Sequence, residues 1–236
     1  MPRKSPSPAA SLSQFRAGLR DITPLSLGVA VYGLAFGLLA AQIGMDGLTT
    51  GLMGLFVFAG SSQIVAAERM AADAGLAVAI LAGLALNLRI LLMTASLHAE
   101  LAGRPWWQIL LGVHLTSDEN WALMHATRAS GRKAGYWYLL GGGTSLVVVW
   151  VLATGAGAGF AGLLPDLTSL GVDFAFTAAF ILLARNLWRG MGDLAPWAVS
   201  ATTAAVLALV LPVDPSWALI AGGLAGVVLA ARPRGD

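Results

Sequence analysis

Eight apolar runs constrain what this chain of 236 residues can fold into. A helix needs about 20 predominantly apolar residues to cross the hydrocarbon core of a bilayer, and most of the runs approach that length. Hydrophobic residues make up 57% of the sequence and charged residues 11%, which is too apolar for one water-soluble core of this size. The sequence therefore predicts an all-α integral membrane protein with about eight transmembrane helices, in the runs 22–43, 51–67, 76–97, 106–126, 136–160, 170–184, 194–211 and 216–231.

The positions of the basic residues predict how these spans are oriented. With eight crossings and a cytoplasmic N-terminus, the Lys and Arg residues between spans fall on the cytoplasmic side, except Arg104. If the polar-interrupted run 106–126 did not cross, seven basic residues from Arg128 onward would move outside. The positive-inside rule therefore favours a crossing there and both termini in the cytoplasm. The predicted parts are a disordered or surface-lying cytoplasmic tail (1–20), one transmembrane domain (21–231) and a cytoplasmic C-terminal tail (232–236).

Composition excludes several other kinds of site. The formal net charge of +2 gives no basic footprint for nucleic acid. The absence of cysteine excludes disulfides and thiolate metal sites, and His114 has no second histidine at ligand spacing. We therefore expect the chain to contact the lipid bilayer and not nucleic acid, and we expect no metal or other cofactor.

A few charged residues nevertheless lie inside the predicted spans. Arg89 is near the centre of the third run, where a charge costs about 2.5–3.5 kcal/mol on insertion scales and is normally paired and functional. Asp118 and Glu119 interrupt the fourth run, and Arg89 is the deep cation available to them. We predict an ion pair between Arg89 and one of these carboxylates. The remaining negative charge would suit a coupling proton or an ammonium group, and the alternative is a purely structural ion pair.

Polar side chains accompany these charges. Asn87 lies about 200° around a helix from Arg89, so the third span is either two-sided or broken at Asn87. The FAGSSQ sequence at 58–63 suits either helix packing or an unwound binding segment. The polar run in the fourth span is either helical or an unwound segment that lines water. Asp173 is either a helix cap or a pathway residue. The candidate substrate-binding or coupling residues are therefore Arg89, Asn87, Asp118, Glu119, Gln63, Ser61, Ser62 and Asp173.

Several of these segments together resemble a known family. The segments are Pro24 with the glycines of the first run, FAGSSQ at 58–63, NLR at 87–89, TSDENWAL at 116–123 and GVDFAFTAAF at 171–180. With these segments in order, the chain resembles the AzlC family of branched-chain amino-acid permeases over roughly residues 15–231. Ile90 stands where that family usually has histidine after NLR.

The resemblance implies a non-enzymatic exporter of valine, leucine or isoleucine in the cytoplasmic (inner) cell membrane. It also implies a small AzlD-like membrane protein as a partner in a two-component system. In that scheme Arg89 binds the substrate carboxylate or is released from its own carboxylate partner. Asp118 and Glu119 meet the substrate ammonium group or carry a proton, while Gln63, Ser61 and Ser62 add hydrogen bonds.

Other classes of protein stay open at this point. A non-catalytic membrane subunit or a channel would need the same spans. An intramembrane hydrolase could use Ser61 or Ser62 with a histidine, although no motif fixes such a pair. A weak similarity between residues 46–49 and 166–168 hints at inverted repeats.

Overall fold

The structure is a computed structural model, and the described residues within it form helices and no strands. The predicted all-α fold is therefore confirmed over these residues. The run 170–184, and Asp173 with it, lies almost entirely outside them. The structure describes residues 7–71, 73, 75–161, 181, 185, 188, 190–211 and 215–231.

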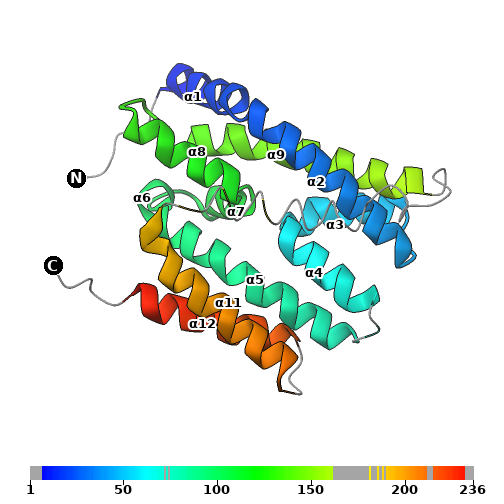
Figure 1. The fold of residues 1–236 in the computed structure, drawn as a ribbon. Coiled ribbons are helices and arrows are strands. Elements are labelled where there is room, and N and C mark those ends of the chain that lie inside the picture. Colours follow the sequence, from blue (N-terminus) through cyan, green and yellow to red (C-terminus); the bar gives the residue numbers. More distant parts are fainter. Residues whose placement is uncertain are drawn as a thin grey trace.

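Three long helices run along the length of the molecule (Figure 1). They are α2 (Thr23–Gln42), α5 (Leu76–Ser96) and α9 (Tyr136–Phe160), with 20, 21 and 25 residues. At 1.5 Å per residue each is about 30 Å or longer, which matches the hydrocarbon core of a bilayer. These helices confirm the first, third and fifth runs as helices long and apolar enough to cross a membrane.

Helix α9 is the axis on which the first half of the chain packs. Helix α2 runs beside it in the same direction, with Ser26 next to Ser145 and Gly37 next to Gly157. A Cβ atom on Gly157 would lie 3.1 Å from the Cα atom of Gly37, so the two backbones touch. Gly157 of the fifth run therefore serves close packing of helices.

The second run does not cross the molecule as one span, contrary to the sequence prediction. It forms two half-length helices, α3 (Gly47–Val57) and α4 (Gly60–Ala71), separated at Phe58, whose φ of 42° is left-handed. Helices of 11 and 12 residues reach about 16–18 Å, or half the hydrocarbon core.

Contacts show that α3 and α4 form a re-entrant pair, which we call the first hairpin. Helix α3 runs antiparallel to α9, from Gly47 beside Gly155 to Gly54 beside Trp150. Helix α4 then returns in the direction of α2, because Gly60 faces Tyr32 and the later residues Ile64 and Ala67 pack on Phe36, Leu39 and Ala40. The first hairpin therefore enters and leaves at the same end of the molecule (Figure 1).

The fourth run also turns back, so the predicted crossing is wrong. It forms α7 (Trp106–His114) and α8 (Asp118–Ala129), which we call the second hairpin. Arg128 forms an ion pair with Glu100 at 2.9 Å, which brings the residues after the hairpin next to those before it. The polar run is where the new helix begins, since Ser117 and Asn120 form a capping box.

The second and fourth runs both turn back, so each removes one predicted crossing. The loss of two crossings leaves the two ends of the chain on the same side as each other. Helix α1 and the end of α12 still lie at one end of the molecule, which we call the α1 end (Figure 1). Arg104 joins Arg128 there, whereas Arg69, in the last turn of α4, lies at the opposite end. Both described ends of the chain therefore lie where the charge count put them relative to each other, although the second and fourth runs do not cross the molecule as single helices. That the α1 end faces the cytoplasm stays a prediction.

Residues 8–21 form helix α1 (Pro8–Asp21), so the N-terminal segment is surface-lying and helical over its described part and not a disordered tail. Ser7 caps the helix and Pro8 suits its first turn. Its Gly18 lies directly against the backbone of Tyr138 at the start of α9.

The remaining described elements complete the molecule. Helix α6 (His98–Leu101) connects α5 to the second hairpin, and η2 (Met191–Asp193) precedes α11 (Leu194–Leu209). Helix α11 packs antiparallel on α12 (Pro215–Ala230), which lies beside α5 (Figure 1). The last two runs thus form a helical hairpin.

Candidate functional site

The tips of the two hairpins meet in the middle of the molecule. The first tip is residues 58–60 and the second is residues 115–117, and the hairpins enter from opposite ends (Figure 1). The rings of Phe58 and His114 lie 6.1 Å apart across the junction. Irregular backbone at this depth is tolerated where protein surrounds it, and it is a common place for substrate sites in transporters.

Arg89 of helix α5 joins the two tips. Its Nη2 atom donates to Ser61 Oγ at 2.6 Å and lies 2.8 Å from Asp118 Oδ2. The side chains of Arg89 and Asp118 are 31% and 17% exposed. The predicted ion pair is thus confirmed, with Asp118 as the partner. An ion pair here offsets much of the cost of placing each charge at membrane depth.

Glu119 belongs to the same cluster but has a different partner. Its Oε2 atom accepts a hydrogen bond from Ser117 Oγ at 2.7 Å. The three groups therefore carry one positive and two negative formal charges when all are ionised. The surplus negative charge expected from the sequence lies beside Asp118, on the first turn of α8.

Asn87 and Arg89 both contact α4, although α5 is an unbroken helix. The Oδ1 atom of Asn87 accepts from Ser62 Oγ at 2.9 Å, while Arg89 reaches Ser61. The long arginine side chain compensates for the angle between the two positions. Helix α5 is therefore not broken at Asn87. The side chains of Asn87 and Arg89 nevertheless both reach helix α4, where they bond to the neighbouring residues Ser62 and Ser61.

The side chain of Gln63 forms hydrogen bonds inside the tip of the first hairpin. Its Oε1 atom accepts from the backbone N–H of Ala59 at 3.2 Å and from Trp150 Nε1 at 3.1 Å. The side chain is 1% exposed, and no described residue accepts from its Nε2 atom. A buried donor without an acceptor costs about 1–3 kcal/mol, so it is a feature that calls for a ligand or another explanation.

The two tips repeat one local design. In each, an amide side chain accepts from the backbone N–H of the residue before the returning helix: Gln63 from Ala59 and Asn120 from Ser117. The first turn of each returning helix also supplies a contact to Arg89. Since the hairpins enter from opposite ends, they form an inverted pair. This repeat differs from the predicted one, whose second half at 166–168 lies outside the described residues.

Helix dipoles add to the electrostatics of the junction. Helices α4 and α8 both begin at the tips, so their N-terminal ends place partial positive charge there. Such ends attract anionic groups. Asp118 and Glu119 in the first turn of α8 already supply negative charge to one of them.

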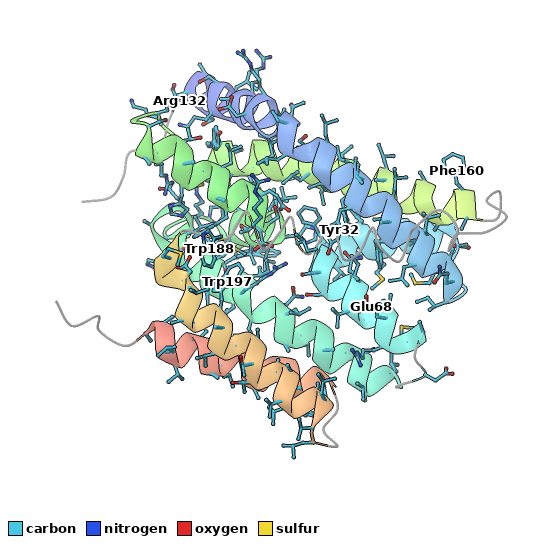
Figure 2. All side chains as sticks on the ribbon, viewed as in Figure 1. Tyr32, Glu68, Arg132, Phe160, Trp188 and Trp197 are labelled. Carbon is cyan, nitrogen blue, oxygen red and sulfur yellow. The ribbon has the colours of Figure 1, made fainter. Side chains whose placement is uncertain are left out.

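Sequence reasoning missed three residues that complete the site. Trp150 and Asn120 hold the tips as described above. The phenol of Tyr32 lies near the middle of the molecule (Figure 2) and within electrostatic range of Arg89, Asp118 and Glu119. The available signal was an aromatic residue with a polar group in mid-span, where belts of Trp and Tyr are not expected.

The structure also bears on other expected features. Asp173 lies outside the described residues, so its place relative to the site stays untested. The described residues contain no group of three or more potential metal ligands. The hydroxyl groups of Ser61 and Ser62 bond to Arg89 and Asn87 and not to a histidine, an arrangement unlike a serine–histidine dyad.

Comparisons with known proteins agree with this interpretation of the chain. The family AzlC protein matches residues 24–164, a range that contains both hairpins and Arg89. An uncharacterized membrane protein of Helicobacter pylori J99 is 26% identical over 194 residues, covering 76% of this chain and 82% of that protein. The inner membrane protein YgaZ of Escherichia coli K12 is 30% identical over 104 residues, covering 44% of this chain and 42% of that protein. No solved structure matches.

Proposed function

The chain belongs to the AzlC family, a family of membrane transporters, and on this premise we propose that it exports branched-chain amino acids across the cytoplasmic membrane. The observation that carries the proposal is the Arg89–Asp118 ion pair at the junction of two re-entrant hairpins. A zwitterionic amino acid has one carboxylate and one ammonium group, and the Arg89–Asp118 pair offers one group of each opposite sign. Valine, leucine and isoleucine are the proposed substrates.

In this proposal the ion pair exchanges partners during transport. The substrate carboxylate competes with Asp118 for Arg89, and the released Asp118, with Glu119, receives the substrate ammonium group. Exchange of one ion pair for two keeps each buried charge compensated, which is necessary because an unpaired buried charge costs several kcal/mol. Ser61, Ser62 and Gln63 then orient the substrate by hydrogen bonds.

The opposed hairpins also suit alternating access. Each enters from a different end, and Arg89 holds both tips through Ser61 and Asp118. Loss of the contact to Asp118 frees the second hairpin from the first, so substrate binding and opening become one event. The surplus negative charge of the cluster would carry a coupling proton, as expected from the sequence.

A small AzlD-like membrane protein is the proposed partner in this transport. The support for it is the family resemblance. The first experiment therefore measures efflux of labelled leucine, valine and isoleucine from liposomes that contain the full chain, with and without that partner, at several external pH values.

The decisive variants are Arg89→Ala and, as a matched control, Arg132→Ala. Arg132 pairs with Asp21 at the α1 end (Figure 2), away from the hairpin tips. We expect saturable efflux that Arg89→Ala abolishes and Arg132→Ala retains. Unchanged efflux in folded Arg89→Ala protein would contradict the central site. Efflux that does not saturate would indicate a channel, and no efflux with the partner present would leave a non-catalytic subunit as the better description.

A further inference from the structure

The two hairpin tips share the same amide-to-backbone hydrogen bond, but they differ in which polar groups have no partner among the described residues. In the second tip, Ser117 Oγ accepts from the N–H of Asn120 at 3.5 Å, so a side chain caps the start of α8. The Nδ2 atom of Asn120 donates to the backbone carbonyls of Leu115 and Leu139. The polar groups of this amide are therefore satisfied within the protein.

The first tip lacks both features. Ala59, which precedes α4, has no side-chain oxygen to cap the helix. No described residue accepts from the backbone N–H groups of Ser61 and Ser62, or from Nε2 of Gln63. All three of these residues are at most 4% exposed. Three buried donors thus lie at the N-terminal end of a 12-residue helix, without an acceptor in the described part of the chain.

The two tips also differ in the charge of the first helical turn that follows each of them. Asp118 and Glu119 lie in the first turn of α8, whereas the first turn of α4 has no acidic residue. The N-terminal end of α8 is therefore compensated by acidic side chains, and that of α4 is not. One tip presents acceptors and the other presents donors.

From this asymmetry we infer that the start of α4, with Nε2 of Gln63, is a seat for the carboxylate of an amino acid. The acidic first turn of α8 then faces its ammonium group, which fixes the orientation of the substrate between the hairpins. This inference rests on the proposed function and adds to it. Arg89 borders the seat through Ser61 and neutralises the carboxylate as it arrives.

Gln63→Glu is the sharpest variant with which to test the seat. It keeps an oxygen that accepts from Ala59 and Trp150, and it replaces only the amide nitrogen with a second oxygen. A carboxylate near the start of a helix is stabilising, so the variant should fold. Its own negative charge would occupy the seat and repel the substrate carboxylate.

The experiment measures binding of leucine and of isopentylamine, which is leucine without its carboxylate, to the purified full chain. We expect Gln63→Glu to weaken leucine binding by at least about tenfold, which is the size of a lost charge-assisted hydrogen bond. Binding of isopentylamine should be unchanged or tighter. Gln63→Met, which has a similar shape and no donor, provides the same comparison should Gln63→Glu fail to fold.

The outcomes separate this inference from the proposed function. Equal losses for leucine and isopentylamine, or unchanged leucine binding, would overturn the seat while leaving transport in place. Wild-type protein that binds no branched-chain amino acid would overturn the proposed function itself. Asn120→Asp serves as the matched control in the other tip. Because its amide holds backbone carbonyls, we expect lower thermal stability and no selective loss of leucine over the amine.

Discussion

Glu100 and Arg128 form an ion pair at 2.9 Å, although an apolar run of membrane-spanning length lies between them. Arg104, between Glu100 and the run, stacks 3.7 Å from the ring centroid of Tyr136, which follows the run. These contacts place both ends of the second hairpin at one end of the molecule. They decide the topology more directly than any count of charges.

This topology predicts the results of cysteine labelling in cells. The natural chain has no cysteine, so single substitutions report one position each. Glu100→Cys and Arg128→Cys should react with a membrane-impermeant maleimide from the same side, and Asp46→Cys and Asp73→Cys from the other. Labelling of positions 100 and 128 from opposite sides would restore the eight-span topology.

The Arg89–Asp118 ion pair should make a large contribution to stability. Removing one partner leaves the other charge buried, so Arg89→Ala or Asp118→Ala should lower the free energy of unfolding by about 3–5 kcal/mol. Replacing both with leucine should recover much of that loss. Thermal unfolding in detergent measures the effect. Glu119→Gln is the control, because its new amide can keep a bond with Ser117, and a loss as large as that of Asp118→Ala would contradict the assigned pairing.

The contact between α2 and α9 should be sensitive to a single methyl group. Gly157→Ala would push a Cβ atom into the backbone of Leu34 and Gly37, at a cost of about 1–3 kcal/mol. At Gly28 in the same pair of helices, an added Cβ atom would have nothing within 4 Å, and alanine there should be neutral or stabilising by up to about 1 kcal/mol. Thermal unfolding of the two variants measures the difference. Equal stability would argue against the close approach.

Asp21 should contribute a pH-dependent part of the stability at the α1 end. Partial burial raises its pKa, but hydrogen bonds from Arg132 and Tyr138 outweigh burial and hold the pKa below its usual value of 3.8. A lowered pKa in the folded state gives stability that is present above the unfolded-state pKa. That stability is lost as the pH falls through the lower folded-state pKa.

Thermal unfolding of wild-type protein and Asp21→Asn as a function of pH tests this contribution. We expect the variant to be less stable near neutral pH and the difference to shrink as the pH falls below about 4. A difference that stays constant through the acid range would show that the Asp21 carboxylate contributes by its shape and not by its charge.

Local signals for the two breaks differed in strength. Ser117 followed by Asp118 and Glu119 is a helix-start pattern that the sequence itself shows, and the structure adds the capping box with Asn120. The left-handed Phe58 had no such signal, because nothing in the residue type favours that conformation. Packing of Gly47 and Gly54 on α9 and of Ile64 on α2 holds the chain in that turn.

The sequence by itself determined that this chain is embedded in a membrane and that Arg89 needs a buried carboxylate. Both follow from transfer energies, which depend on residue type and run length. Only the tertiary structure decided that two runs turn back, that Asp118 and not Glu119 pairs with Arg89, and that Nε2 of Gln63 finds no acceptor among the described residues. The same apolar run can form either one long helix or two half-length helices. The choice between them therefore rests on contacts between segments far apart in the chain.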